Sequence, residues 1–324
     1  MIKIIPILYL LLFISCQDSS KNNRVEDIFG CMDQNASNFD INATVSNDSC
    51  IFKGCTDSEA VNYNPFATID DGNCLSEDLI PEGHTYYWND EFNGDTLNRK
   101  YWNIENWWTG AFNNELQSYT SELSNITLQN GYLYIRAQKE NPFNPNQPKY
   151  TSGRLNTKDK VELKYGYWEV RAKLPSGIGT WPAIWMLNSI IDSIPWPHSG
   201  EIDIMEHVGY DPDRVYFSMH NENLYGNVHG TDQQGVYYLE NIEDDFHIYS
   251  IEWDESEVRG YVDGIEIFDK SRENNYSDWP YDSPFFLIIN LAIGGDWGGV
   301  QGVDNSIFPS SFIIDFARLY KKNS

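Results

Sequence analysis

The sequence predicts an all-β protein, a sandwich of two large antiparallel sheets that follows a small disulfide-rich repeat region. Three observations predict it: residues 165–174 alternate apolar and mixed side chains, residues 285–293 form an unbroken apolar run, and every cysteine lies before residue 75. No stretch keeps a 3.6-residue apolar period for three turns, so long helices are not expected. Many short strands over about 240 residues without an internal linker favour a sandwich over a barrel.

Composition limits the classes of ligand. The 324 residues include 48 acidic and 22 basic side chains, a formal charge of −26. A surface this acidic repels phosphate backbones, which excludes nucleic acid as a partner and suits neutral ligands and divalent cations. Aromatic residues make up 15% of the chain, with 11 Trp and 21 Tyr, which indicates a ligand that is bound by flat faces.

The N-terminus has the features of a secretion signal over residues 1–15. Lys3 is followed by an apolar run, residues 4–14, that is too short to span a bilayer. The run ends in Phe-Ile-Ser-Cys at Cys16, which resembles the lipobox of bacterial lipoproteins and implies cleavage before Cys16 and its lipidation. The alternative is ordinary cleavage that leaves Cys16 spare. We expect a polar tether at residues 16–29 and an exported monomer, anchored by lipid to the bacterial outer membrane at the cell surface.

Two cysteine repeats follow over residues 30–74. Residues 30–50 and 54–74 align at an offset of 24 (55 − 31). Units of this size bury little apolar surface, so exported modules of this kind rely on disulfides or metals. The simplest of three possible connectivities pairs Cys31 with Cys50 and Cys55 with Cys74.

The repeats are also rich in acidic and amide side chains, which favours weak Ca²⁺ binding through oxygen ligands. They resemble calcium-binding repeats of the thrombospondin type 3 sort, and the alternative is a disulfide-stapled spacer without an ion. A linker at residues 75–84 then leads into a single β domain at residues 85–322.

Turn signals and apolar runs define the strands of that domain. Asn130-Gly131 and Asp263-Gly264 each separate two short strand-like runs, and both dipeptides tolerate the positive φ of a two-residue hairpin. Residues 285–293 have the length of a strand that is buried on both faces. Residues 313–320 are expected to close the domain as its last strand.

The most informative segment is residues 199–209, SGEIDIMEHVG. In a strand, Glu201 and Asp203 point to one face. Strict alternation would place Met205 beside these acids and turn Glu206 into the apolar layer, where a bare carboxylate is costly. One extra residue, a β-bulge near Met205, would return Glu206 to the acidic face.

Three carboxyl groups on one face repel one another, which raises at least one pKa toward the range of a general acid. Retaining glycoside hydrolysis needs two carboxyl groups roughly 5–5.5 Å apart, whereas four strand steps span about 13 Å. The sheet must therefore be concave. Glu201 would then attack the anomeric carbon, Glu206 would protonate the leaving oxygen, and Asp203 would hydrogen-bond the nucleophile. The alternative is an exposed acidic strand edge or a metal site.

Tryptophans surround this segment in the sequence. Trp181 and Trp185 lie four apart on one face of the preceding strand, and Trp196 is five residues before Glu201. Trp297 sits in GGDWGG, where glycines let a ligand approach the backbone closely. Sugar rings stack on indole faces, so the tryptophans favour a carbohydrate ligand, although any single one could simply pack in the core.

Residues 88–320 resemble glycoside hydrolase family 16, and within it the bacterial laminarinases, which are endo-acting β-1,3-glucanases. The motifs that carry the resemblance are WNDEF (88–92), NNELQSYT (113–120), SGRLNTK (152–158), YGYWEVRAKLPSGIGTWPAIWML (165–187), GEIDIME (200–206) and NLAIGGDWGG (290–299). The resemblance implies a concanavalin-like β-jelly-roll sandwich with an open cleft on its concave sheet.

The resemblance also assigns residues. It implies Glu201 as nucleophile, Glu206 as acid/base and Asp203 as their helper. The residues that it places along the sugar subsites are Asn114, Arg154, Trp181, Trp185, Trp196, His220 and Trp297. Many members hold a structural Ca²⁺ on the convex side, and the matching positions are the Asp315 carboxylate with the carbonyls of Glu91 and Gly131. No cofactor is expected in the chemistry.

The predicted activity is endo-hydrolysis of β-1,3-glucosidic bonds in laminarin-type glucans by a retaining double displacement. A second enzyme of the same fold would act on mixed-linkage β-1,3-1,4-glucan or on a galactan. A third alternative, from another functional class, is a non-catalytic glucan-binding lectin, which the loss of either glutamate would favour.

Overall fold

The computed structural model describes residues 27–34, 36–141 and 149–323, and the chain divides into two compact units, Met1–Phe52 and Lys53–Ser324. The predicted signal peptide and Cys16 lie outside the described residues. Within the described ranges, no helix is both long and apolar enough to cross a membrane.

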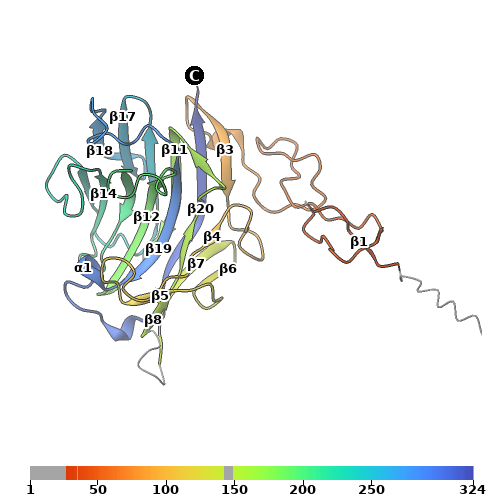
Figure 1. Cartoon of the computed structure of the whole chain (residues 1–324), viewed down its shortest axis with the longest axis horizontal. Coiled ribbons are helices and arrows are strands. Elements are labelled where there is room, and N and C mark those ends of the chain that lie inside the picture. Colours follow the sequence, from red (N-terminus) through yellow and green to blue (C-terminus); the bar gives the residue numbers. More distant parts are fainter. Residues whose placement is uncertain (1–26, 35, 142–148, 324) are drawn as a thin grey trace, which may run out of the picture. The chain divides into compact units, whose positions relative to one another are not determined.

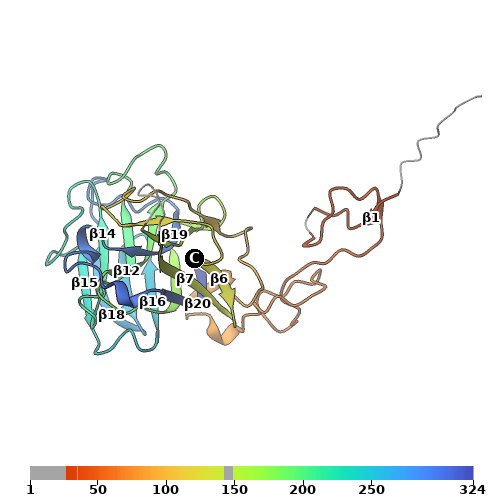
Figure 2. The same ribbon diagram turned by 90° about the horizontal axis from the view of Figure 1, so that it is seen from below.

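The larger unit is a sandwich of two sheets, as predicted (Figures 1 and 2). Seen from below in Figure 2, β14, β12 and β19 lie in one layer and β18, β16 and β20 in the other. In the described part of the chain, the first layer has eight strands in the order β15-β14-β13-β12-β19-β9-β4, with β10 also paired to β19. The second has ten in the order β18-β17-β16-β11-β20-β7-β8-β5, with β3 on β20 and β6 on β7.

The strands of the eight-stranded sheet are β4 (Asn103–Ile104), β9 (Arg154–Asn156), β10 (Glu162–Leu163), β12 (Thr180–Asn188), β13 (Glu201–Glu206), β14 (Arg214–His220), β15 (Gln234–Tyr238) and β19 (Phe285–Ile293). Those of the ten-stranded sheet are β3 (His84–Asp90), β5 (Gln117–Tyr119), β6 (Ile126–Gln129), β7 (Tyr132–Lys139), β8 (Tyr150–Ser152), β11 (Gly166–Lys173), β16 (Phe246–Trp253), β17 (Glu257–Val262), β18 (Ile265–Ser271) and β20 (Ser310–Lys322). The short helices are η1 (Glu77–Leu79), α1 (Gly295–Gly298) and η2 (Asn305–Ile307).

The two strands that predicted the fold occupy central positions. All nine residues of β19 are buried, and it pairs with β12 over its whole length. In β11, Trp168, Val170 and Ala172 are buried in the core between the sheets, while β11 pairs with β16 on one side and β20 on the other. The core combines aliphatic and aromatic side chains, with Trp253 packed edge-on against Phe285 of the facing sheet at 5.3 Å. Each such buried side chain contributes about 1.5–3 kcal/mol.

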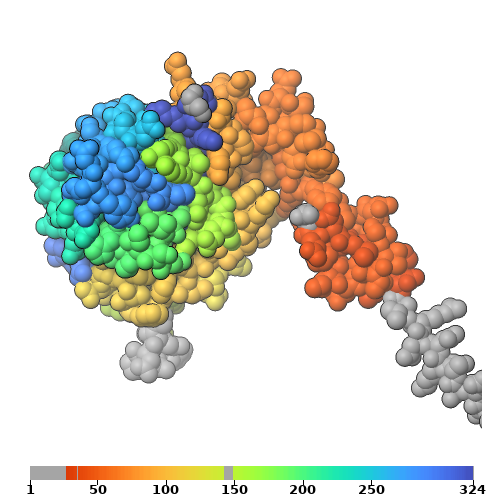
Figure 3. Space-filling model, turned by 45° about the horizontal axis from the view of Figure 1, so that its top comes forward, coloured from red at the N-terminus to blue at the C-terminus, as the bar shows by residue number. Residues whose placement is uncertain are grey.

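Both predicted hairpins are present. Asn130 and Gly131 have φ of 55° and 80°, and Asp263 and Gly264 have φ of 49° and 76°. The first pair joins β6 to β7 and the second joins β17 to β18. The last strand is longer than expected, since β20 spans Ser310–Lys322, and its end lies beside the start of β3 (Figure 3).

The two cysteine repeats form the predicted disulfides, Cys31–Cys50 and Cys55–Cys74. Equivalent hydrogen bonds also form within each repeat, at positions that differ by 24 residues. Asn38 donates to the carbonyl of Ser49 and accepts from the amide of Ile51, and Asn62 donates to the carbonyl of Asn73 and accepts from the amide of Leu75. In each repeat, one asparagine is therefore bonded to the two residues that flank the second cysteine.

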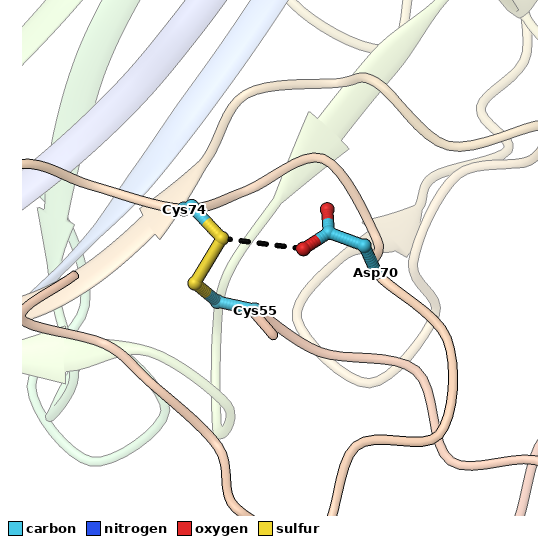
Figure 4. A group of neighbouring side chains, drawn as sticks. All are labelled: Cys55, Asp70 and Cys74. Atoms are coloured by element: carbon cyan, nitrogen blue, oxygen red, sulfur yellow. Dashed lines mark hydrogen bonds between the residues drawn. A yellow bond between two sulfur atoms is a disulfide. The ribbon is translucent and has the colours of Figure 1, made fainter. Parts of the chain in front are cut away.

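Many acidic and amide side chains of the repeats cap turns. Asp40, Asp57 and Asp70 each accept a hydrogen bond from the backbone N–H two residues later. Asp70 also accepts from the amide and hydroxyl of Thr56, and it touches the sulfur of Cys74 (Figure 4). Asx turns of this kind stabilise a chain that has almost no sheet.

The second repeat belongs to the larger unit, so the division between the compact units falls inside the predicted repeat region. Its contacts are with β3 and the residues that follow it. The side-chain oxygen of Asn73 accepts from the backbone N–H of Glu91 at 2.8 Å, and its carbonyl accepts from Asn89 at 3.0 Å. Asn93 donates to the carbonyl of Gly72 at 2.7 Å. The second repeat is therefore part of the same folded body as the sheets.

Replacing Asn73 by alanine is expected to lower the free energy of unfolding of the larger unit by about 1–3 kcal/mol, because the N–H of Glu91 loses its acceptor. Denaturant unfolding followed by tryptophan fluorescence measures this change. The matched control is Ser49→Ala, at the same position of the first repeat, where Asn47 is the one partner of the hydroxyl among the described residues; its expected effect is within about 0.5 kcal/mol. Equal losses from the two variants would contradict the proposed role of Asn73.

Candidate active site

The carboxylate row lies on β13, between β12 and β14. Its pairing with β12 runs from Leu187 opposite Glu201 to Trp185 opposite Asp203, then skips Ile204, so that Ala183 lies opposite Glu206. The pairing with β14 shifts over the same interval. This is the predicted β-bulge, one residue earlier than the position that the sequence suggested.

The bulge separates the acids from the core. Ile204 and Met205 are both buried, at 1% and 0% exposure, while Glu201, Asp203 and Glu206 all line one cavity of about 470 Å³. Without the extra residue the third acid would point into the apolar layer. The three predicted acids are therefore brought together.

Two cavities meet at this row, each of about 470 Å³. They share Asn113, Trp181, Trp196, Glu201 and Glu206. One extends over β12, β19 and β9, and the other over β14, β15 and α1. A chain-like ligand could therefore extend to both sides of the two glutamates.

Burial raises the pKa of every acid in the row, and the charge of Asp203 adds to this rise at both glutamates. Burial raises the pKa of Asp203 to about 8, against a hydrogen bond with Glu201 that lowers it. Burial and the charge of Asp203 raise the pKa of Glu206 to about 8 and that of Glu201 well above its usual value. The three groups cannot all ionise near pH 7, so they titrate as one coupled cluster.

His220 joins this cluster from the neighbouring strand. It lies opposite Glu201 in the β13–β14 pairing, and its Nε2 is 2.9 Å from Asp203 Oδ2 and 3.8 Å from Glu201 Oε1. The hydroxyl of Tyr281 donates to the carbonyl of His220 at 2.8 Å. The predicted His220 is thus a direct neighbour of the acids.

Two of the predicted tryptophans are fixed by their indole N–H groups. Trp181 donates to Glu206 Oε1 at 3.0 Å, and Trp185 donates to Asn290 at 2.7 Å. Both remain only partly buried in the cleft. Trp297 packs edge-on against Trp181 at 5.6 Å, and Trp196 is 42% exposed at the cleft wall. All four predicted tryptophans line the cleft.

The guanidinium of Arg154 lies close to two aromatic rings. Its guanidinium lies 4.7 Å from the ring of Phe112 and 4.8 Å from that of Trp185. Its Nε is 3.0 Å from Glu105, and the side chain is almost fully buried. Arg154 therefore presents a fixed positive charge to the cleft beside Trp185.

Asn114 does not line either cavity; its neighbour Asn113 does. Both residues have a left-handed backbone, with φ of 53° and 45°. In this turn the Asn114 side chain points to α1, where it donates to Asp296 at 2.8 Å. Its observed role is to hold α1, which carries Trp297.

Sequence reasoning missed a further buried carboxyl group in the cleft, that of Glu115. Glu115 accepts hydrogen bonds from Gln117 at 2.6 Å and from the Tyr119 hydroxyl at 2.9 Å. Asn290 donates to that hydroxyl and accepts from Trp185, so a continuous chain of hydrogen bonds links Glu115 to Trp185. The only sequence feature that could have indicated Glu115 was its position in the motif NNELQ (113–117). The other unpredicted residues of the two cavities are Phe112, Asn113, Ala183, Leu187, Ile191, Ser218, Gly226, Asn227, Val228, His229, Gln234, Asn290, Ala292 and Asp296.

The predicted calcium positions converge on the other sheet. β20 pairs with β7 up to Ile314 and with β3 from Ala317, so Asp315 lies where its neighbour changes. Glu91 follows β3 and Gly131 precedes β7, so all three positions meet at this junction. The Asp315 carboxylate pairs with Arg171, and the Glu91 carboxylate pairs with Arg318 at 2.8 Å. The carbonyls suit a hard cation, while the Asp315 carboxylate already has a cationic partner.

Comparison with known proteins gives consistent matches. The sequence profile described as glycosyl hydrolases family 16 matches residues 105–311. A β-glucanase of Rhodothermus marinus is 41% identical over 244 residues, 72% of this chain and 84% of that protein. A glucan endo-1,3-β-glucosidase A1 of Niallia circulans is 37% identical over 74% of this chain and 38% of that protein. The crystal structure of a laminarinase from Flavobacterium sp. UMI-01 is 42% identical, with a TM-score of 0.67, and the match covers 73% of this chain and all of that one.

The Glu206 pKa tests the electrostatics of the row. Replacing Asp203 by asparagine is expected to lower this pKa from about 8, because a neighbouring negative charge is lost. Replacing Trp181 by phenylalanine is expected to raise it, because the carboxylate loses a hydrogen-bond donor. Titration by ¹³C NMR of glutamate-labelled protein measures both shifts. Two shifts of the same sign would contradict this account of the row.

Proposed function

The chain belongs to glycosyl hydrolase family 16, and we propose that it is an endo-acting β-1,3-glucanase that cleaves laminarin-type glucans with retention of configuration. The observation that carries the proposal is the bulge at Ile204, which places Glu201, Asp203 and Glu206 on one cleft wall where two cavities meet. The laminarinase and glucosidase names of the similar proteins support the choice of glucan.

In the first step the Glu201 carboxylate attacks the anomeric carbon while Glu206 gives its proton to the leaving glycosidic oxygen, so that an ester to Glu201 forms as the glycosidic bond breaks. In the second step Glu206 takes a proton from water, the water oxygen attacks the anomeric carbon, and the ester bond to Glu201 breaks. Retention follows from the two inversions.

The surroundings support this division of roles. The charges of His220 and Arg154 both favour the ionised form of Glu201, while only His220 does so for Glu206. The raised pKa of Glu206 favours its protonated form near neutral pH, the form in which it acts as the acid. The indole N–H of Trp181 then stabilises the carboxylate that Glu206 becomes after it has given up the proton.

Endo cleavage is supported by the two cavities. A glucan chain bound across β9, β12, β13 and β14 would have sugar units on both sides of the scissile bond. The partly exposed faces of Trp185 and Trp196 would stack on sugar rings, and Arg154 would donate to their hydroxyls. Mixed-linkage glucan is the second candidate substrate, since one similar protein is named only a β-glucanase.

Replacing Glu201 by glutamine is expected to reduce reducing-sugar release from laminarin at least about a thousandfold while laminarin binding is retained, because the amide keeps the shape of the nucleophile but cannot attack. The matched control is Glu115→Gln, a buried carboxyl in the same cavity that lies off β13, and this variant should remain a hydrolase. If the Glu201 variant still hydrolysed laminarin, Glu201 could not be the catalytic nucleophile.

Two product assays complete that test. The ¹H NMR spectrum of fresh product should show the β-anomer first, and an initial α-anomer would rule out retention. Digests of laminarin, lichenan and agarose separate the substrate classes, since release from lichenan alone would favour the mixed-linkage alternative and release from agarose the galactan one.

We further propose a lipid anchor on Cys16 that holds the exported enzyme at the outer membrane. The support is the short apolar run that ends in Phe-Ile-Ser-Cys, in residues outside the described part of the structure. Cys16→Ser should move the protein from the membrane fraction to the soluble fraction, and an unchanged distribution would contradict the anchor.

A structural Ca²⁺ is proposed at the junction of β3, β7 and β20, with Asp315 and the carbonyls of Glu91 and Gly131 as ligands. The support is the convergence of these positions, and binding would require Asp315 to share its carboxylate with Arg171. The melting temperature should be higher in Ca²⁺ than in chelator. Equal melting temperatures in the two conditions would contradict the proposed calcium site.

A further inference from the structure

Three side chains in the cleft have the chemistry of a transition-metal site. Glu201, Asp203 and His220 each offer one ligand atom, and these atoms lie within 4.8 Å of one another. They come from adjacent strands, β13 and β14, whose pairing sets Glu201 opposite His220. One imidazole nitrogen and two carboxylate oxygens form a ligand set that suits Zn²⁺.

The ligand atoms are buried and incompletely bonded. Asp203 is 3% exposed and His220 is 6% exposed. Among the described residues, Asp203 Oδ2 and His220 Nδ1 have no hydrogen-bond partner, and Oδ2 lies 2.9 Å from His220 Nε2 in an ion-pair contact. Oδ2 and Nε2, two potential ligand atoms, therefore lie side by side on the adjacent strands β13 and β14. A cation between the strands would satisfy both atoms.

The other candidate cluster among the described residues has no such capacity. Cys55, Asp70 and Cys74 also lie within 4.8 Å of one another, but the two sulfurs form a disulfide (Figure 4). Metal binding by cysteine needs a thiolate, which a disulfide sulfur cannot supply. Of the two clusters, only the one in the cleft has side chains that can bind a metal ion.

We propose that Glu201, Asp203 and His220 bind one Zn²⁺ or a similar divalent transition-metal ion, and that this ion inhibits the enzyme by occupying the nucleophile. Three protein ligands leave a fourth tetrahedral position for water on the cleft side, where Glu201 lines both cavities. The inhibition rests on the proposed function, whereas the binding does not.

Charge and ligand type set the selectivity. Buried carboxyl groups that repel one another gain from a divalent cation between them. Ca²⁺ takes six to eight oxygen ligands, and Mg²⁺ needs near-ideal octahedral geometry. A site with one nitrogen and two oxygens should therefore discriminate against both ions.

Calorimetric titration of the full-length protein with ZnCl₂ tests the binding directly. The wild type should bind one Zn²⁺ in the cleft, and His220→Gln should weaken that binding by more than about tenfold, because a ligand nitrogen is lost. The matched control is His247→Gln, which removes an imidazole that pairs with the single carboxylate of Asp263 on the other sheet. This variant should bind like the wild type. Equal Zn²⁺ binding by the wild type and His220→Gln, or no binding by the wild type, would overturn the proposal.

Laminarin hydrolysis tests the inhibition. Zn²⁺ should inhibit the wild type and His247→Gln reversibly at concentrations where Ca²⁺ and Mg²⁺ have no effect, and chelator should restore the rate. For His220→Gln, the half-inhibitory Zn²⁺ concentration, measured against its own uninhibited rate, should rise by more than about tenfold. Zn²⁺ bound at His220 without loss of activity would overturn the inhibitory role. A protein that binds Zn²⁺ through His220 but never hydrolyses glucan would instead contradict the proposed function.

Discussion

The active site depends on one irregularity in strand β13, the extra residue at Ile204. A regular strand would place either the apolar residues in the cleft or an acid in the core. The bulge lets Ile202, Ile204 and Met205 remain buried while Glu201 and Glu206 face the same cleft. The change of register therefore keeps the apolar side chains in the core and both glutamates in the cleft. Both β12 and β14 follow the shift in their pairing.

Repulsion within the acid row is a cost that the rest of the sandwich must offset. The row is flanked by β12 and β14, the fully buried strand β19 lies beyond β12, and the facing sheet supplies large aromatic side chains to the core. This rigid support keeps three carboxyl groups together that would otherwise separate in water. Burial, together with the charge of Asp203, raises the pKa of Glu206 to about 8, so the environment that the fold builds around the row also makes Glu206 an acid near neutral pH.

Much of this could be predicted from sequence because it follows from local periodicity. The apolar run of β19, the two hairpins and the bulge all appear as patterns in adjacent residues. Asn113 could not be chosen over Asn114, because a left-handed turn decides which side chain enters the cleft. Arg154 between Phe112 and Trp185, and Asn73 on Glu91, depend on segments that are far apart in the chain. Local sequence patterns do not predict contacts between such distant segments.

The most direct measurement of the central claim is the separation of the two catalytic carboxyl groups in a crystal structure with a bound laminari-oligosaccharide. Two glutamates that act on one glycosidic bond with retention require their carboxyl groups to be roughly 5–5.5 Å apart, on opposite sides of the anomeric carbon. We expect that spacing for Glu201 and Glu206. A separation beyond about 6.5 Å, or a Glu206 side chain turned into the core, would contradict the account.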